Sequence, residues 1–460
     1  AGAARGRSCR GGWLRPLRGS RSGRVDYARP RRLTIARVTI ARIAGTRRFK
    51  SDARVRTVRQ TRRAAVHGCA ARLASDPHPL RIRRGHAKRW VRRRSRQMGY
   101  LYNAARDIKN SIPIVRDVYA SVRRGIAAAL HPIDRSYAGR LSTETGLYKD
   151  VADVHQLPPI FHYWSNKHLR PMLEEHGFSN PDQFFAKYLG ESARRRGVDA
   201  PVFLSIGAGN CDTEVRIAKQ LRNAGVEHFT IDCLDVNPSM LERGLEFARR
   251  EGVAGHIATM QGDFNEWRAG REYDGVMANQ SLHHVANLEH LFAEVRACLA
   301  RGGYFIVDDM IGRNGHQRWP EALVAVRTFW RELPRDHRYN RQLSRYERVY
   351  RNWDCSNEGF EGIRAQDILP LLIDRFDFHL FIGFANVVDV FIDRAFGHNF
   401  DADAEWDRGF IDRVHAFDED SFRTGVLTPT HMMAVLAVDE PRTCVCARGL
   451  TPETSVRNAA

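Results

Sequence analysis

The stretch LSIGAGNCDTE, residues 204–214, joins an apolar run to a helical segment through two glycines one residue apart. This pattern is typical of a strand that passes into a helix beneath a bound cofactor, because glycine permits a tight turn and a close approach of backbone to ligand. Asp212 stands where the dinucleotide fingerprint has its third glycine, and its carboxylate would repel a pyrophosphate. The turn therefore favours a nucleoside-like ligand without phosphates.

The chain beyond residue 201 alternates between short apolar runs and helical stretches. Apolar runs begin near residues 202, 228, 256, 273 and 303, and two more follow near 376 and 430. Strands that alternate with helices indicate βαβ units, in which helices cover both faces of a parallel sheet. We therefore expect an α/β fold with a doubly wound, mostly parallel sheet.

Two acidic residues follow the second and third expected strands. Asp235 ends the second strand, where a carboxylate can accept both ribose hydroxyls of an adenosyl group. The alternative is a capping or turn role, because Asn237 and Pro238 start the next helix. Asp263 has the position to accept from an adenine amino group, with Phe264 against the ring. A turn aspartate before a core phenylalanine fits the same spacing equally well.

Five segments, taken in order, resemble class I S-adenosylmethionine-dependent methyltransferases: SIGAGNCD, DVNPSML, GDF, YDGVMANQSLHHV and LARGGYFIVDD. The resemblance is close over residues 202 to about 310 and implies a Rossmann-like methyltransferase fold with S-adenosyl-L-methionine as cofactor. The cofactor-binding residues that it implies are Ser205, Gly207, Gly209, Asp235, Val236, Asp263, Phe264 and Asn279. Two positions depart from the family pattern, since Ser205 replaces an acid and Cys211 replaces a glycine.

Methyl transfer from a sulfonium requires alignment and exclusion of water more than it requires a catalytic group. A base is needed only where the nucleophile is poor, so the family has no universal catalytic residue. The candidates here are His283 and His284 after the fourth strand and Asp308 at the end of the fifth. The histidines have packing or helix-capping as their alternative role, and we expect one of Asp308 and Asp309 to be a solvated loop acid.

The residues expected to cover the crevice are Tyr163, Trp164 and Trp319, together with the helical region to about residue 375. Aromatic side chains at helical spacing also serve as plain core packing. We expect a small-molecule acceptor. The alternatives are an RNA- or tRNA-modifying methyltransferase that uses a basic arm, and a regulatory protein that binds the cofactor without turnover.

The formal charge of +20 is concentrated in residues 1–97, which hold 30 Lys and Arg against three acids, a net +27. The remainder of the chain is therefore net −7. The Arg-rich segment is expected to be disordered or to lie outside the native chain. An organelle-targeting peptide and a nucleic-acid-binding arm are the alternatives. A groove that tracks phosphates is not indicated for the folded part, because acids are interspersed among its basic residues.

We expect four parts in the chain. They are the Arg-rich segment 1–97, a helical region 98–200, a methyltransferase domain 201–439 with helical insertions at about 311–375 and 386–427, and an unstructured tail 440–460.

The eight cysteines lack the paired spacing of a zinc site, so we expect no metal. Free thiols are typical of a reducing compartment, which favours a cytoplasmic location. No apolar stretch approaches the roughly 18 residues that are needed to cross a bilayer.

Overall fold

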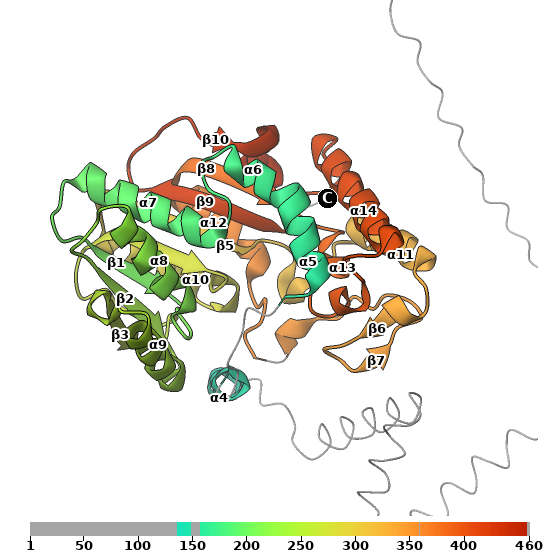
Figure 1. Ribbon diagram of the computed structural model, residues 1–460, viewed down its shortest axis with the longest axis horizontal. Coiled ribbons are helices and arrows are strands. Elements are labelled where there is room, and N and C mark those ends of the chain that lie inside the picture. The colour runs from blue at the N-terminus through green and yellow to red at the C-terminus, as the bar shows by residue number, and fades with distance from the viewer. Residues whose placement is uncertain (1–135, 149–156, 358, 458–460) are drawn as a thin grey trace, which may run out of the picture. The chain divides into compact units, whose positions relative to one another are not determined.

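The computed structural model describes residues 136–148, 157–357 and 359–457 (Figure 1). All of these residues belong to one compact unit. The predictions for residues 1–97, and for the first part of the helical region to residue 135, lie outside the described residues.

The centre of the unit is an eight-stranded sheet with the strand order β10–β8–β9–β5–β4–β1–β2–β3 (Figure 1). Its strands are β1 Val202–Ile206, β2 Thr230–Asp235, β3 Ile257–Gln261, β4 Tyr273–Asn279, β5 Leu299–Met310, β8 Asp377–Phe384, β9 His431–Ala437 and β10 Val445–Cys446. The strands from β3 to β5 pair in parallel, and β9 runs antiparallel to both β5 and β8. The prediction of a doubly wound, mostly parallel sheet is confirmed.

The described α-helices connect and cover these strands. They are α4 Tyr137–Tyr148, α5 Pro159–Trp164, α6 Arg170–Glu174, α7 Pro181–Arg196, α8 Asp212–Asn223, α9 Pro238–Arg250, α10 Leu288–Cys298, α11 Pro320–Glu332, α12 Ala365–Arg375, α13 Asp389–Ile392, α14 Glu405–Arg423 and α15 Pro452–Ser455. The part of the chain that the structure describes contains no helix that is both long and apolar enough to span a membrane.

Both faces of the sheet carry apolar side chains. Successive residues of a strand point to opposite sides, so a continuous apolar run supplies side chains to both faces. Phe203 of β1 shares a core with α7, α8 and α9, whereas Leu204 shares a separate core with α10 and α12. Strands buried on both faces read as continuous apolar runs, which is why β1, β2, β4 and β5 are visible in the sequence.

The strand order reverses at β1, which pairs with β2 on one side and β4 on the other. In doubly wound sheets the connections leave in opposite directions at this point, and the carboxyl ends of the strands border a crevice. The glycine turn after β1 and the first residues of α8 therefore lie at the place where this fold binds ligands.

Two expected features of the later chain differ from the structure. The insertion 311–375 is only partly helical, since a short hairpin, β6 Tyr339–Asn340 with β7 Arg345–Tyr346, separates α11 from α12. The tail from Glu440 is ordered, since β10 extends the sheet beside β8 and Thr451 caps α15 with a capping box. A strand of two residues and a helix of four residues are too short to produce a periodic apolar pattern.

Candidate functional site

The glycine turn after β1 is held against the end of β2. Gly207 and Gly209 have φ values of 75° and 54°, and the N–H groups of Gly207 and Ala208 both donate to the Leu234 carbonyl, at 2.8 and 3.1 Å. A Cβ added at Gly207 would lie 2.4 Å from the Ser281 Cβ. The left-handed backbone and the close approach of the loop after β4 both require glycine at position 207.

Asp235 links the turn to the second strand. Its side chain is buried, its Oδ2 accepts from the Gly209 N–H at 2.9 Å, and its Oδ1 accepts from the Asn237 N–H at 2.8 Å. These two bonds give Asp235 the turn role and place its carboxylate at the carboxyl edge of the sheet, beside the glycine turn. Val236, beside it, is partly buried.

Asp263 and Phe264 follow β3. Asp263 Oδ1 accepts from the backbone and side-chain N–H groups of Asn265, both at 2.9 Å, and Oδ2 accepts from the Tyr137 hydroxyl of α4. Burial, followed by the neighbouring Asp263 carboxylate, raises the pKa of Tyr137, which therefore stays a hydrogen-bond donor. Phe264 is packed in the core beside α10. The structure therefore gives Phe264 a packing role.

Ser205 faces a carboxyl group that the sequence interpretation missed. Its hydroxyl donates to Glu214 Oε1 at 2.6 Å, and both side chains are buried. Burial raises the pKa of Glu214 to about 7. The second carboxyl oxygen, Oε2, is buried and has no hydrogen-bond partner among the described residues. The acid that the family carries at position 205 is thus present at the same turn, but it comes from the first turn of α8.

Asn279, at the end of β4, donates from Nδ2 to Thr213 Oγ1 at 3.2 Å, beside the start of α8. Gly207, Gly209, Asp235, Glu214 and Asn279 therefore come together around one turn. This arrangement fits a nucleoside with a charged amino-acid end, because the turn requires glycine at position 207 and Glu214 Oε2 is a buried oxygen without a partner among the described residues.

Neither aspartate at the end of β5 is solvated, so that expectation is wrong. Asp308 is buried, and burial together with the Asp309 charge raises its pKa to about 7. Its Oδ1 accepts from Gln280 Nε2 at 3.1 Å. Asp309 is fully buried. Its Oδ2 accepts from the N–H groups of Ser281 and Leu282, at 2.9 and 2.7 Å, and these bonds replace the water that burial removes.

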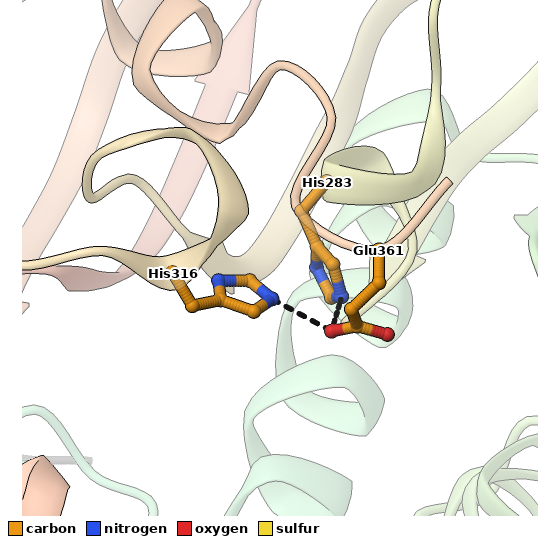
Figure 2. Close-up of side chains that lie close together, drawn as sticks. All are labelled: His283, His316 and Glu361. Atoms are coloured by element: carbon orange, nitrogen blue, oxygen red, sulfur yellow. Dashed lines mark hydrogen bonds and ion pairs between the residues drawn. The ribbon is translucent and has the colours of Figure 1, made fainter. Parts of the chain in front are cut away.

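His283 lies between the carboxylates of Asp309 and Glu361, and Figure 2 shows its ring beside Glu361. Its Nδ1 is 2.7 Å from Asp309 Oδ1, and its Nε2 is 3.6 Å from Glu361 Oε1. Burial lowers the pKa of the His283 ring, but the Asp309 and Glu361 carboxylates outweigh burial and raise it to about 10. His284 Nε2 is 3.5 Å from Glu361 Oε2, and His316 Nε2 is 2.6 Å from Glu361 Oε1. Burial raises the pKa of Glu361, whereas His283 and His316 hold it well below its usual range.

No pattern in the sequence singles out His316 or Glu361. His316 lies 45 positions from Glu361, and no spacing rule joins residues so far apart. The sequence feature that the two residues share is an adjacent glycine at a backbone turn. Gly315 (φ 65°) precedes His316, and Gly362 (φ 64°) follows Glu361.

The aromatic residues expected to cover the crevice pack on other elements. Trp164 is buried and its Nε1 donates to His415 Nδ1 of α14 at 3.3 Å, while the Tyr163 hydroxyl bonds to Asp412 of the same helix. Trp319 lies between two guanidinium groups, 5.3 Å from Arg313 and 4.5 Å from Arg457. None of these three contacts involves the glycine turn.

Residues 203–303 match the family described as a methyltransferase domain. No curated protein matches the chain. One similar solved structure is the O-methyltransferase of a trans-AT PKS multienzyme from Brevibacillus brevis in complex with S-adenosyl-L-homocysteine, with 11% identity, 66% of this chain and 88% of that chain covered, and a TM-score of 0.35. Another is geranyl diphosphate C-methyltransferase from Streptomyces coelicolor A3(2), with 10% identity, 66% and 100% coverage, and a TM-score of 0.36. Both TM-scores are below 0.5. The assignment of a methyltransferase domain therefore rests on the family match over residues 203–303 and on the sheet topology.

The substitution Glu214→Gln should change how the stability of the ligand-free protein depends on pH. The native pKa is raised from 4.5 to about 7, so between these values the native state holds a proton that the unfolded chain has released. Stability therefore falls as pH rises through this window, and glutamine removes that loss. Urea unfolding at pH 5 and pH 8 should show the variant gaining on the wild type with rising pH, by a difference on the order of 3 kcal/mol.

The matched control is Glu246→Gln, because the Glu246 side chain is 61% exposed on α9. It should leave the pH dependence as in the wild type. A stability difference between Glu214→Gln and the wild type that is the same at both pH values would contradict the buried, protonated carboxyl group.

Proposed function

Since the chain carries a class I S-adenosylmethionine-dependent methyltransferase domain, we propose that it transfers the methyl group of S-adenosyl-L-methionine to a small-molecule acceptor. The observation that carries the proposal is the position of Asp235. Its buried carboxylate lies at the carboxyl edge of the sheet, where it accepts from the N–H groups of Gly209 and Asn237 and so stands directly beside the glycine turn.

The cofactor is S-adenosyl-L-methionine, and we assign its parts to separate residues. Asp235 holds the ribose hydroxyls, and Asp263 accepts from the adenine amino group. Gly207 and Gly209 form the floor beneath the methionine part. Glu214 faces the amino group, because its Oε2 is a buried acceptor without a partner in the described chain. Ser205 acts through Glu214, which it orients by a hydrogen bond.

When bound, the cofactor supplies a methyl group on a sulfonium, which a nucleophile displaces in line. The protein must align the acceptor and exclude water, for which orientation contributes up to roughly 7–11 kcal/mol. The crevice borders suit this task because Asn279 and Asp308, which are register partners on β4 and β5, are fixed by hydrogen bonds to Thr213 and Gln280.

Among the three candidate bases, Asp308 is best suited to accept a proton. Both ring nitrogens of His283 face carboxylates, and His284 faces Glu361. Asp308 instead has a pKa raised to about 7 by burial, which places it near the pH at which a general base is most effective. We assign it the proton of a hydroxyl or enol acceptor.

A small acceptor is favoured over a nucleic acid by charge. Residues 98–460 are net −7; Asp308 and Asp309 are neighbours at the end of β5, and Glu361 lies on the other side of the His283 ring from Asp309. A nucleic-acid groove requires the opposite sign, because phosphate contacts supply most of its affinity.

The substitution Asp235→Ala should weaken binding of S-adenosylmethionine by about 10- to 100-fold, because hydrogen bonds to a charged group contribute about 1.5–3 kcal/mol. Calorimetric titration measures the affinity, and thermal unfolding checks that the variant remains folded. The control Asp374→Ala removes a carboxylate that is 77% exposed on α12 and should bind as the wild type does. Unchanged affinity in a folded Asp235→Ala would remove the basis of the proposal.

The substitution Asp308→Asn should lower kcat by about 10²- to 10⁴-fold and leave cofactor affinity intact, because it removes only the proton acceptor. The wild-type rate should rise with pH through about 7 as Asp308 ionises, and the variant should lose this rise. The measurement is incorporation of labelled methyl groups into a metabolite pool at several pH values. A full rate in the variant would exclude Asp308 as the base, and cofactor binding without turnover in the wild type would favour a regulatory protein.

Removal of residues 1–97 should leave methyl transfer to metabolites unchanged, because the remaining chain contains all the residues of the proposed site. Activity of the shortened and full chains should be compared on metabolite and tRNA pools over a range of salt concentrations. Loss of activity on shortening, with tRNA methylation that falls steeply with salt, would instead support the RNA-modifying alternative.

A further inference from the structure

Three side chains from separate segments meet beside the end of β5 (Figure 2). They are His283 of the short helix η3 (Leu282–His284), His316 of η4 (Asn314–His316), and Glu361 from the loop before α12. One nitrogen or oxygen atom from each lies within 4.8 Å of the atoms offered by the other two. Figure 2 shows both rings pointing toward the same oxygen of Glu361.

We propose that His283, His316 and Glu361 bind one divalent transition-metal ion, such as Zn²⁺, through two Nε2 atoms and a carboxylate oxygen. Two histidines and one carboxylate form a ligand set that such ions use when they keep positions open for water or substrate. The distances from Glu361 Oε1 to His316 Nε2 and His283 Nε2, 2.6 and 3.6 Å, bring the donors close enough for one ion after a small side-chain adjustment.

The first support is the carboxylate behind His283. Histidine ligands usually donate their other ring N–H to a carboxylate, which fixes the tautomer and turns the free nitrogen toward the metal. Asp309 has this position, 2.7 Å from Nδ1, and is itself fixed by the N–H groups of Ser281 and Leu282. Nε2 of His283 is thereby directed toward Glu361 and His316.

The second support is that the three backbone segments are bonded to one another. The Gly315 N–H donates to the Gly362 carbonyl at 2.8 Å, and the Ile363 N–H donates to the His283 carbonyl at 3.0 Å. His316 itself has φ 52°, an unfavourable conformation for a histidine that tends to occur at functional sites. The backbone therefore holds all three side chains at one place.

The third support is charge. The fully buried Asp309 carboxylate and the partly exposed Glu361 carboxylate lie at the two nitrogens of the buried His283 ring, and two carboxylates so close together favour a positive charge between them. A divalent ion would supply that charge and use the lone pairs of His283 and His316. A permanently protonated His283 is the competing account, and it predicts no metal affinity.

The side chains also indicate where the ion would be reached. The His283 side chain is only 4% exposed, whereas the Glu361 side chain is 33% exposed, so the open positions face the Glu361 side. His283 follows β4 and Asp309 ends β5, so the site borders the same edge as the glycine turn. A second inference rests on the proposed methyl transfer: the acceptor is a molecule with a hydroxyl or enol group, and the oxygen of that group completes the coordination of the ion. A bound metal lowers the pKa of such an oxygen and so makes it a better nucleophile.

The test uses the full chain, stripped with a chelator and dialysed. Calorimetric titration with Zn²⁺ and optical titration with Co²⁺ should show one ion bound by nitrogen and oxygen ligands. His316→Gly, in which glycine suits the left-handed backbone, and the isosteric Glu361→Gln should each weaken binding by at least about 100-fold. Asp309→Asn should weaken it by about 10- to 100-fold, because it removes the carboxylate behind a ligand.

The matched control is His337→Ala. His337 Nε2 lies 2.9 Å from Asp407 Oδ1, so this is a histidine–carboxylate pair that belongs to no triad of potential metal ligands in the described chain. The variant should bind metal as the wild type does. Wild-type affinity in both His316→Gly and Glu361→Gln overturns the site, as does a thiolate-to-cobalt charge-transfer band, which would place the ion at cysteines.

Failure of the metal site and failure of the methyltransferase proposal give different results. A chain that binds S-adenosylmethionine but no metal overturns only the metal site. A chain that binds metal at the triad but not the cofactor overturns only the proposed function. Methyl transfer at the full rate in metal-free protein overturns the acceptor role of the ion.

Discussion

The contact on which the site depends is the pair of hydrogen bonds that the Asp235 carboxylate accepts from Gly209 and Asn237. The bond from Gly209 joins the end of β2 to the turn after β1, the bond from Asn237 fixes the carboxylate locally, and the Leu234 carbonyl accepts two more bonds from the same turn. Because Gly207 leaves no room for a Cβ beside Ser281, the turn is also pressed against the loop after β4. Three neighbouring strands are thereby fixed at the edge where the fold binds its ligand, with one buried carboxylate at the centre.

Buried carboxyl groups recur around this centre, and each has a different partner. Within the described residues, Glu214 accepts from Ser205 and has one oxygen without a partner, Asp309 accepts from three backbone N–H groups and contacts a histidine, and Asp308 accepts from the side chain of Gln280. The partners explain the different pKa directions. Burial dominates at Glu214 and Asp308, whereas hydrogen bonds from histidines hold the pKa of Glu361 low. Unequal environments let neighbouring acids serve as ligand contact, proton acceptor and support for a histidine.

Much of the fold could be predicted because β1, β2, β4 and β5 are largely buried and the helices between them carry one apolar side. The strand ends placed Gly207, Asp235 and Asn279 at one edge, since the carboxyl ends of parallel strands share it. The short segments late in the chain were harder to predict. The tail from Glu440 contains elements too short for a periodic signal, and Trp164 is a core residue against α14, which its aromatic character alone could not distinguish from a ligand contact.

The amino-acid sequence by itself determined the strand and helix order, the glycine turn and the acids at the strand ends, because these depend on local composition and periodicity. Only the tertiary structure decided which distant side chains meet. Position 205 is a serine, and Glu214 supplies a carboxyl group at the same turn because the first turn of α8 faces the end of β1. His283, His316 and Glu361 meet because hydrogen bonds between Gly315 and Gly362, and between Ile363 and His283, hold three loops together. Contacts of this kind depend on chain packing, which no spacing in the sequence encodes.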